Sequence, residues 1–350
     1  MATTFNRDSL PSPSDLKSLA KTNVYQALCM YYALQAPDPR GVSPQYRAYE
    51  ATLVIDRDDG TTPKEEGQDA IKLIQTRRGT SSMGYDVPFP TDAQIDAVTL
   101  NGVSCYWISF PGQHSWKSGP FMVGWHGGAF LYCGIQTHAG LYAEISRSFD
   151  MPILFVEYRL APEAQFPAPR EDLLNVHKAL IAEDASCPQR LCVYGESAGG
   201  NLSLSYAQVA LAAGLPPPKA CIALSPYVDM ECQGKSYTEN AKTDLWMTPA
   251  QAAWWWRQCS WTIPAHETEM NLFRGSFAGF PPVYIWVGGA ELLLSDAERV
   301  TQALRTAGCD VTLHVQPYMQ HNHAQYIPFS PEAKGATAKM RTWLREKMTL

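Results

Sequence analysis

The segment 195–199, Gly-Glu-Ser-Ala-Gly, places a serine between two glycines at the spacing G-x-S-x-G. It directly follows the apolar run Leu191–Tyr194 and opens a segment with helical spacing. A serine at such a strand–turn–helix junction is typical of a nucleophile. Side chains beside it would collide in so tight a turn, and glycine has no Cβ. The pattern therefore predicts that Ser197 is a nucleophile at the N-terminus of a helix, where developing negative charge is favoured.

A second glycine pair follows another apolar run. The segment 126–129, His-Gly-Gly-Ala, comes at the end of Phe121–Trp125. Glycines let backbone N–H groups turn toward one point, so we expect Gly127, Gly128 and Ala198 to form an oxyanion hole. One such donor typically contributes about 3 kcal/mol of transition-state stabilisation. The histidine of this segment is expected to fix the loop rather than to act as a base.

A serine nucleophile of this kind needs an acid and then a histidine later in the chain. Glu291 is the first acid after the apolar run Val283–Val287, and Asp296 is an alternative five residues on. His321 and His323 both follow the last apolar run of the chain and precede its final helical segment. Spacing alone does not decide which of the two acids and which of the two histidines belongs to the site.

At these motifs the chain resembles the hormone-sensitive lipase family of α/β-hydrolases. The resemblance covers roughly residues 97–344, and the first 90 residues match only as the family's variable N-terminal cap. Ala129 stands where many members have a third glycine. The matching segments are His-Gly-Gly at 126–128, Tyr-Arg-Leu-Ala-Pro-Glu at 158–163, the turn and helix start at 195–202, and Ser-Pro-Tyr-Val-Asp at 225–229.

The resemblance implies a serine esterase with Ser197, Glu291 and His321 as its triad. Met319, one residue and His321 fit the family's pattern around the base, whereas the next two residues, Asn and His, replace its usual Gly-Phe. No cofactor and no metal ion is implied. The expected substrate is a small carboxylic ester with a short acyl chain, and the many aromatic residues admit a bulky or planar alcohol part, such as a natural-product ester or lactone. Amide hydrolysis, acyl transfer, elimination and a non-catalytic receptor are the alternatives.

Eight short strands alternate with helices from residue 97 onward, which predicts an α/β fold with a mostly parallel sheet and helices on both faces. Asn101-Gly102 predicts a hairpin between the first two strands. The expected strands are 97–99, 104–110, 121–125, 153–158, 191–194, 221–224, 283–287 and 312–316. The expected helices are 14–36, 139–149, 170–183, 198–213, 295–308 and 331–347.

Substrate choice is assigned to a helical cap made of residues 1–55 and 230–275, and the catalytic domain to residues 56–229 and 276–350. Residues 56–68 are polar and are expected to form a surface loop. The segment 249–261 carries four tryptophans. Three consecutive tryptophans cannot share one narrow helical stripe, so this helix is wedged between layers or forms a lid. The expected substrate contacts are Trp254, Trp255, Tyr25 and Phe130.

The composition is that of a globular protein, with 45% hydrophobic and 18% charged residues, and it excludes dominant disorder. The net charge of −6 without a basic block disfavours nucleic acid and anionic membranes as partners. No apolar run is long enough for a spanning helix. Nine scattered cysteines and no signal sequence favour reduced thiols and a cytoplasmic location, and a homodimer stays open.

Overall fold

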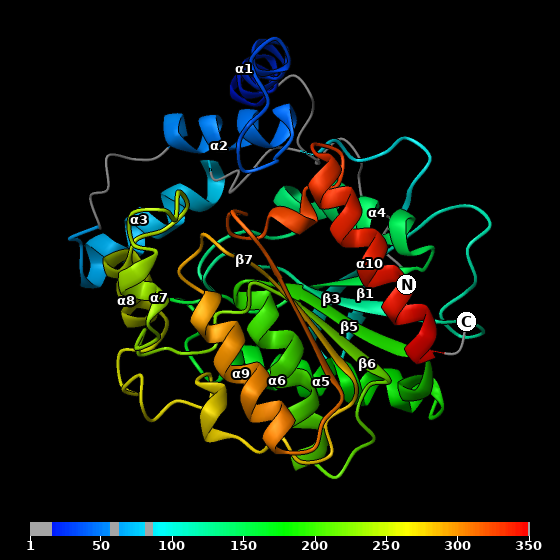
Figure 1. Cartoon of the computed structure of the whole chain (residues 1–350). Helices are drawn as coiled ribbons and strands as arrows, with labels where there is room; N and C mark the ends of the chain where they lie inside the picture. The colour runs from blue at the N-terminus through cyan, green and yellow to red at the C-terminus, as the bar shows by residue number, and fades with distance from the viewer. Residues whose placement is uncertain (1–15, 57–62, 81–86, 349–350) are drawn as a thin grey trace.

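A central eight-stranded sheet organises the chain (Figure 1), in a computed structural model that describes residues 16–56, 63–80 and 87–348. The strand order is β1-β2-β4-β3-β5-β6-β7-β8. β2 pairs antiparallel with β1 and β4, and all other pairs are parallel. The predicted mixed sheet is thus confirmed. The strands are β1 (Gln94–Leu100), β2 (Val103–Ser109), β3 (Phe121–Trp125), β4 (Ile153–Glu157), β5 (Leu191–Glu196), β6 (Ala220–Leu224), β7 (Val283–Gly288) and β8 (Val311–Gln316).

Helices cover both faces of this sheet because its central strands are apolar on both sides. Successive side chains alternate between faces; in β5, Val193 packs with one buried cluster and Tyr194 with the other. The first cluster lies under α5 (Ala168–Glu183), α6 (Ala198–Ala212) and α9 (Leu294–Thr306), and the second under α4 (Ile135–Phe149) and α10 (Pro331–Met348). These five predicted helices are confirmed, with ends shifted by a few residues.

The remaining helices lie at one end of the sheet. α1 (Leu16–Ala33) was predicted, and α2 (Pro44–Asp56), which forms a hairpin with it, was not. α8 (Pro249–Cys259) was predicted, and α3 (Gly67–Thr80) lies beside it in Figure 1. The shorter elements are α7 (Ser236–Glu239) and the 3₁₀ turns η2 (Cys187–Arg190), η3 (Leu272–Arg274) and η4 (His323–Gln325).

The expected surface loop at 56–68 lies partly outside the described residues, and its last two residues begin α3. The indole N–H of Trp254 in α8 donates to the backbone oxygen of Glu65, 3.0 Å away. Ala70 and Ile74 of α3 belong to the same buried cluster as Trp254. The segment 63–80 therefore packs on α8, although the expected domain boundary at residue 56 assigned it to the catalytic domain.

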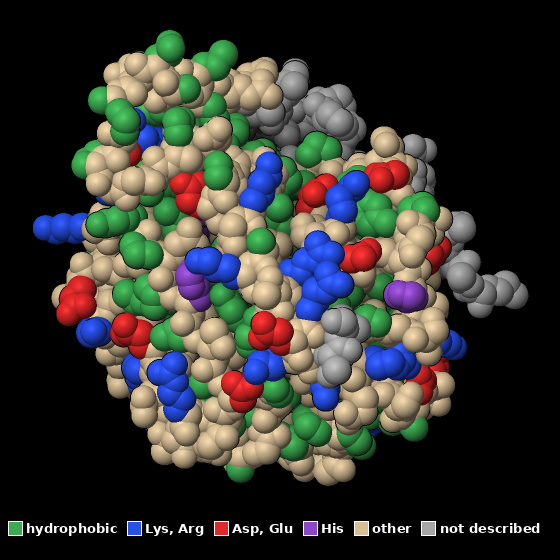
Figure 2. Space-filling model, turned by 45° about the vertical axis from the view of Figure 1, so that its right-hand side comes forward, with side chains coloured by type: hydrophobic (Ala, Val, Ile, Leu, Met, Phe, Trp, Pro, Cys, Tyr) green, Lys and Arg blue, Asp and Glu red, His purple; other side chains and the backbone are tan. Residues whose placement is uncertain are grey.

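The surface carries charges of both signs. Figure 2 shows Lys and Arg side chains interspersed with Asp and Glu on one face of the molecule, with hydrophobic side chains at the top. Large exposed apolar residues in or just after α1 are Val24, Met30, Tyr31 and Leu34.

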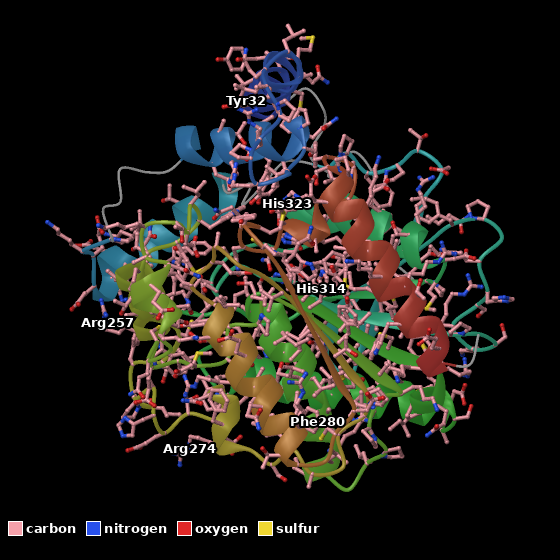
Figure 3. The ribbon with its side chains drawn as sticks, in the orientation of Figure 1. Tyr32, Arg257, Arg274, Phe280, His314 and His323 are labelled. Carbon is pink, nitrogen blue, oxygen red and sulfur yellow. The ribbon has the colours of Figure 1, made fainter. Side chains whose placement is uncertain are left out.

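The α1–α2 hairpin packs on the loop that follows β8. The Tyr46 hydroxyl accepts the backbone N–H of Gln320 at 2.9 Å. The ring of His323 lies against Tyr46 and Tyr49, with ring centroids 4.6 and 4.8 Å apart, below α2 in Figure 3. Its Nε2 lies 2.7 Å from the Ser330 hydroxyl. His323 is thus a packing residue between the hairpin and this loop.

Two glycines let the β5–α6 turn pass close to β3. A Cβ on Gly199 would lie 1.8 Å from the backbone oxygen of Trp125, and one on Gly195 would lie 2.1 Å from the backbone oxygen of Gly199. Backbone atoms in a sheet cannot move aside at small cost. In contrast, a Cβ on Gly335 in α10 would meet nothing within 4 Å.

The Gly199→Ala variant is therefore expected to be strongly destabilised, because its methyl group would overlap a β-strand. The matched Gly335→Ala variant should be as stable as the wild type or gain up to about 1 kcal/mol, since alanine is favoured over glycine inside a helix. Urea unfolding of both purified proteins checks this. A Gly199→Ala protein that unfolds at the wild-type urea concentration would contradict the packing argument.

His323 makes stability depend on acid. Burial lowers the pKa of its ring from 6.5 to about 3. Between these values the unfolded chain binds a proton that the folded chain does not, so stability present above the unfolded pKa is lost as the pH falls.

In the His323→Gln variant this titrating group is gone. The free energy of unfolding should then fall less steeply on acidification below about pH 6.5 than in the wild type, by up to about 1.4 kcal/mol per pH unit. Urea unfolding across a pH series measures both slopes. Other buried groups, such as Asp296, titrate in both proteins and cancel in the comparison. Identical slopes would show that His323 is not held neutral.

Candidate active site

The three predicted triad residues, together with Ser225, which was not predicted as a site residue, follow four neighbouring strands. Ser197 follows β5, Ser225 follows β6, Glu291 lies beyond β7, and His321 lies beyond β8. These four strands are consecutive in the sheet and parallel. Their carboxyl ends therefore meet at one edge, which is where open α/β sheets place their sites.

Ser197 sits on a strained turn between β5 and α6. Its φ of 57° and ψ of −118° lie outside the regions that side chains favour, which costs about 1–3 kcal/mol. Its N–H donates to the backbone oxygen of Leu224 at 2.9 Å, and its carbonyl accepts the N–H of Tyr227 at 3.1 Å. The loop after β6 thus clamps both sides of the serine, and the predicted strand–turn–helix junction is confirmed.

Glu291 is the acid that bonds to a histidine. Its Oε2 lies 2.6 Å from Nδ1 of His321, and the carboxylate is fully buried. Its Oε1 accepts the N–H of Gly288 at 2.5 Å and the hydroxyl of Ser225 at 2.7 Å. An ionised carboxylate only accepts hydrogen bonds, so Nδ1 carries the hydrogen and Nε2 is the nitrogen whose lone pair can accept one.

Asp296, the alternative acid, serves another purpose. Its Oδ2 accepts the N–H groups of Val228 and Asp229 at 3.1 and 3.0 Å. Burial raises the pKa of this carboxyl to about 8. Asp296 therefore fixes the loop after β6, and the geometry favours Glu291 as the partner of His321. His323, the alternative base, is enclosed by the α1–α2 hairpin as described above.

The other ring nitrogen of His321 also has a partner. The side-chain N–H of Asn322 donates to Nε2 at 3.1 Å, and the backbone N–H of Asn322 donates to the Ser225 hydroxyl at 3.2 Å. Among the hydrogen bonds between described residues, none joins His321 to Ser197. Sequence reasoning noticed Asn322 as a departure from the family pattern but did not foresee this contact.

The loop after β3 lies against the serine, but in a different register from the one expected. A Cβ on Gly127 would lie 3.2 Å from Cβ of Ser197. The N–H of Gly127, however, donates to Oε1 of Glu196 at 2.6 Å. The expectation that Gly127 supplies an oxyanion donor is therefore wrong for this structure, because a backbone N–H has one hydrogen and a buried carboxylate holds it.

The loop after β3 turns back on itself directly after Gly127. Gly128, Ala129 and Phe130 all have positive φ, of 105°, 55° and 61°. No hydrogen bond between described residues uses the N–H of Gly128, Ala129 or Ala198. The candidate oxyanion hole thus shifts one residue along the loop, with Ala198 unchanged.

Glu196 was missed by sequence reasoning. It is buried and also accepts the Tyr142 hydroxyl at 3.0 Å, while Nε2 of His138 lies 3.4 Å from its Oε1. A carboxylate directly before the serine could have been read as the anchor of the oxyanion loop. His126 donates from Nδ1 to the carbonyl of Gly127 at 2.8 Å, and burial lowers the pKa of its ring to about 3, as a neutral loop-fixing residue requires.

The four residues expected to contact the substrate differ in their burial and in their hydrogen bonds. Phe130 is buried and stacks on Tyr227, with ring centroids 6.4 Å apart, close to the serine. Trp254 is fully buried and bonded to residue 65, and Tyr25 holds the hairpin by donating to the backbone oxygen of Phe329. These two do not fit a role in substrate binding. Trp255 is partly buried against the core, and its role stays a prediction.

Trp246, which was not among the expected substrate contacts, lies beside His321. Its ring lies edge-on to the ring of His321 at a centroid distance of 6.4 Å. Its indole N–H donates to the Tyr49 hydroxyl in α2 at 2.8 Å. The buried carboxylate of Asp244 accepts its backbone N–H at 2.7 Å. The Trp246 ring beside His321 is therefore held both by α2 and by the residues that precede α8.

Neither a metal centre nor a membrane span emerges from these residues. Within residues 16–56, 63–80 and 87–348, no group of three or more His, Cys, Asp or Glu is arranged to hold a metal ion. In the same part of the chain, no helix combines the length and the apolar character that crossing a bilayer would need.

Comparisons with known proteins agree with this geometry. Residues 122–325 match a family model described as the alpha/beta hydrolase fold. The chain is 30% identical to an acetyl-hydrolase of Streptomyces hygroscopicus over 71% of this chain and 82% of that protein. It is 30% identical to the esterase LipU of Mycobacterium tuberculosis over 63% of this chain and 76% of that protein.

A solved esterase from the bacterial hormone-sensitive lipase family superposes with a TM-score of 0.77 at 30% identity, covering 87% of this chain and 99% of that one. The matched residues include the serine turn, Glu291, His321 and the loop after β3. The chain belongs to the hormone-sensitive lipase family of α/β-hydrolases.

Proposed function

We propose that this protein hydrolyses carboxylic esters with Ser197 as the nucleophile. The observation that carries the proposal is the buried Glu291–His321 pair, 2.6 Å apart, at the strand ends next to a serine held at positive φ. A neutral imidazole oriented by a carboxylate is the general base that a serine hydroxyl needs. The related acetyl-hydrolase and esterases support the same reaction class.

In the first half of the reaction, Ser197 Oγ attacks the ester carbonyl carbon while its proton passes to Nε2 of His321. Glu291 stabilises the imidazolium ion. The carbonyl oxygen becomes an oxyanion, which the N–H groups of Gly128, Ala129 and Ala198 receive. When the C–O bond to the alcohol breaks, His321 gives its proton to the leaving oxygen.

In the second half, water attacks the acyl-serine and gives its proton to His321. The tetrahedral intermediate collapses, the acid leaves, and the proton returns to Ser197 Oγ. Each step uses groups that the chain itself supplies.

The acyl chain is proposed to be short. Phe130 and Tyr227, both buried and stacked, fill the space next to the oxyanion loop, and one relative is named an acetyl-hydrolase. The cap is proposed to comprise residues 1–55 and 230–275, together with 63–80 because that segment packs on α8. Trp246 would then face the alcohol part of the ester, since that part must lie beside His321 to be protonated.

The Ser197→Ala variant is expected to lose at least about a thousandfold in kcat, because the covalent step is no longer available. Ser203→Ala is a matched control, since this buried serine lies in α6, the helix that Ser197 precedes, and its hydroxyl bonds only to the Gly200 carbonyl among the described contacts. Hydrolysis of p-nitrophenyl acetate and labelling with a fluorophosphonate probe provide two readouts. Near-normal turnover or labelling in Ser197→Ala would refute the proposal.

The two histidines should separate clearly. His321→Gln should lose at least about a thousandfold in kcat, because it removes the base. His323→Gln should stay within about tenfold of the wild type in kcat while its unfolding profile changes, because His323 packs and does not react. Steady-state kinetics with p-nitrophenyl acetate checks both. The reverse pattern would move the base to His323.

A further inference from the structure

Asn322 forms a hydrogen bond to Nε2 of His321, the nitrogen that must accept the serine proton in the proposed reaction. Its Nδ2 lies 3.1 Å from Nε2 of His321. Since Nδ1 of the ring carries the hydrogen toward Glu291, Nε2 is an acceptor, and only the N–H side of the amide can face it. The residue as a whole is 7% exposed.

One lone pair cannot serve two donors. Nε2 has a single in-plane lone pair, and the proton of Ser197 must reach it before the hydroxyl can attack. The Asn322 amide therefore has to leave Nε2 whenever the base works. In an enclosed site an amide that loses its partner is destabilised, so a replacement partner would favour the working state.

The other end of this amide lacks a partner among the described residues. Oδ1 of Asn322 is buried and has no hydrogen-bond donor among the described residues. The side chain thus offers one donor that must be given up and one acceptor that is unused. A hydroxyl group can accept a hydrogen bond from the Asn322 N–H and donate one to its Oδ1.

The substrate brings such a group to this place if its alcohol part carries one. The ester oxygen of the alcohol has to approach Nε2 to be protonated as it leaves. A hydroxyl on the neighbouring carbon of that alcohol then lies beside the Asn322 amide, which is itself in hydrogen-bond contact with Nε2.

The backbone conformation permits an asparagine here but does not require its side chain. Residue 322 has φ 56° and ψ 16°, a left-handed conformation that glycine adopts at least as easily. Its backbone N–H is held by Ser225, so the loop does not depend on the side chain.

We propose, resting on the esterase function above, that Asn322 is a specificity-determining residue for esters whose alcohol part carries a free hydroxyl on the carbon next to the ester-bearing carbon. Such substrates are partial esters of diols and polyols. The hydroxyl forms hydrogen bonds with the Asn322 amide, so that Nε2 of His321 can accept the proton of Ser197. With an ester that lacks the hydroxyl, the amide competes with the serine for the base.

The test compares 2-hydroxyethyl acetate with propyl acetate, which have the same number of heavy atoms and differ by a hydroxyl in place of a methyl group. Acid release is followed by titration at constant pH for the wild type and Asn322→Gly. The preference in kcat/KM for the hydroxyl ester should fall by roughly fivefold to tenfold in Asn322→Gly, and kcat for propyl acetate should rise because the base is freed. Intrinsic reactivity of the two esters cancels in the comparison of variants.

Asn101→Gly is the matched control. Asn101 also has positive φ, of 45°, and lies in the β1–β2 turn, so this variant makes the same chemical change away from the site and should keep the wild-type preference. An unchanged preference in Asn322→Gly, or an equal loss of activity on both esters, would overturn the inference while leaving the esterase function intact. Failure of the wild type to hydrolyse either ester, or p-nitrophenyl acetate, would instead overturn the function on which it rests.

Discussion

The site depends on one backbone constraint, the left-handed conformation of Ser197 at the end of β5. A side chain at φ 57° persists only where its neighbours leave no alternative. Here they are the carbonyl of Leu224 and the N–H of Tyr227. The same tight turn forces α6 so close to β3 that residue 199 has no room for a Cβ. The loop that follows β3 therefore emerges beside the serine, and the oxyanion donors lie there as a consequence of the turn.

Two buried carboxylates then order the groups on either side of the serine. Burying a charge is unfavourable unless hydrogen bonds satisfy it. Glu196 is satisfied by the Gly127 amide and the Tyr142 hydroxyl, and so fixes the oxyanion loop. Glu291 is satisfied by an amide, the Ser225 hydroxyl and His321, and so fixes the base. Phe130 and Leu131 of the first loop and Leu292 of the second are buried in the core, and the need to satisfy each charge fixes the orientation of the polar groups between these anchors.

The sequence predicted what short-range patterns determine. Buried parallel strands are continuous apolar runs, so all eight were found, and G-x-S-x-G after such a run located the serine. Contacts between distant residues were beyond this reasoning. Which amides face the serine depends on the φ values of residues 128–130 and on Glu196, and the glycine count pointed one residue too early. Aromatic content likewise could not tell Trp254, which is buried under α3, from Trp246, which lies beside His321.

Helix α2 and residues 244–247 contact the loops that carry Glu291 and His321. Tyr46 of α2 bonds to the loop that carries His321, and Tyr49 of the same helix holds Trp246 beside the imidazole. Asp244 joins the cap insertion to the acid loop, since its carboxylate accepts the amides of Trp246 and Leu292. A displacement of α2 or of residues 244–247 would therefore move groups within bonding distance of the triad loops. The residues that hold the Trp246 ring beside His321 are thus also those that hold the loops of Glu291 and His321, because Asp244 bonds to Leu292 and α2 bonds to Gln320.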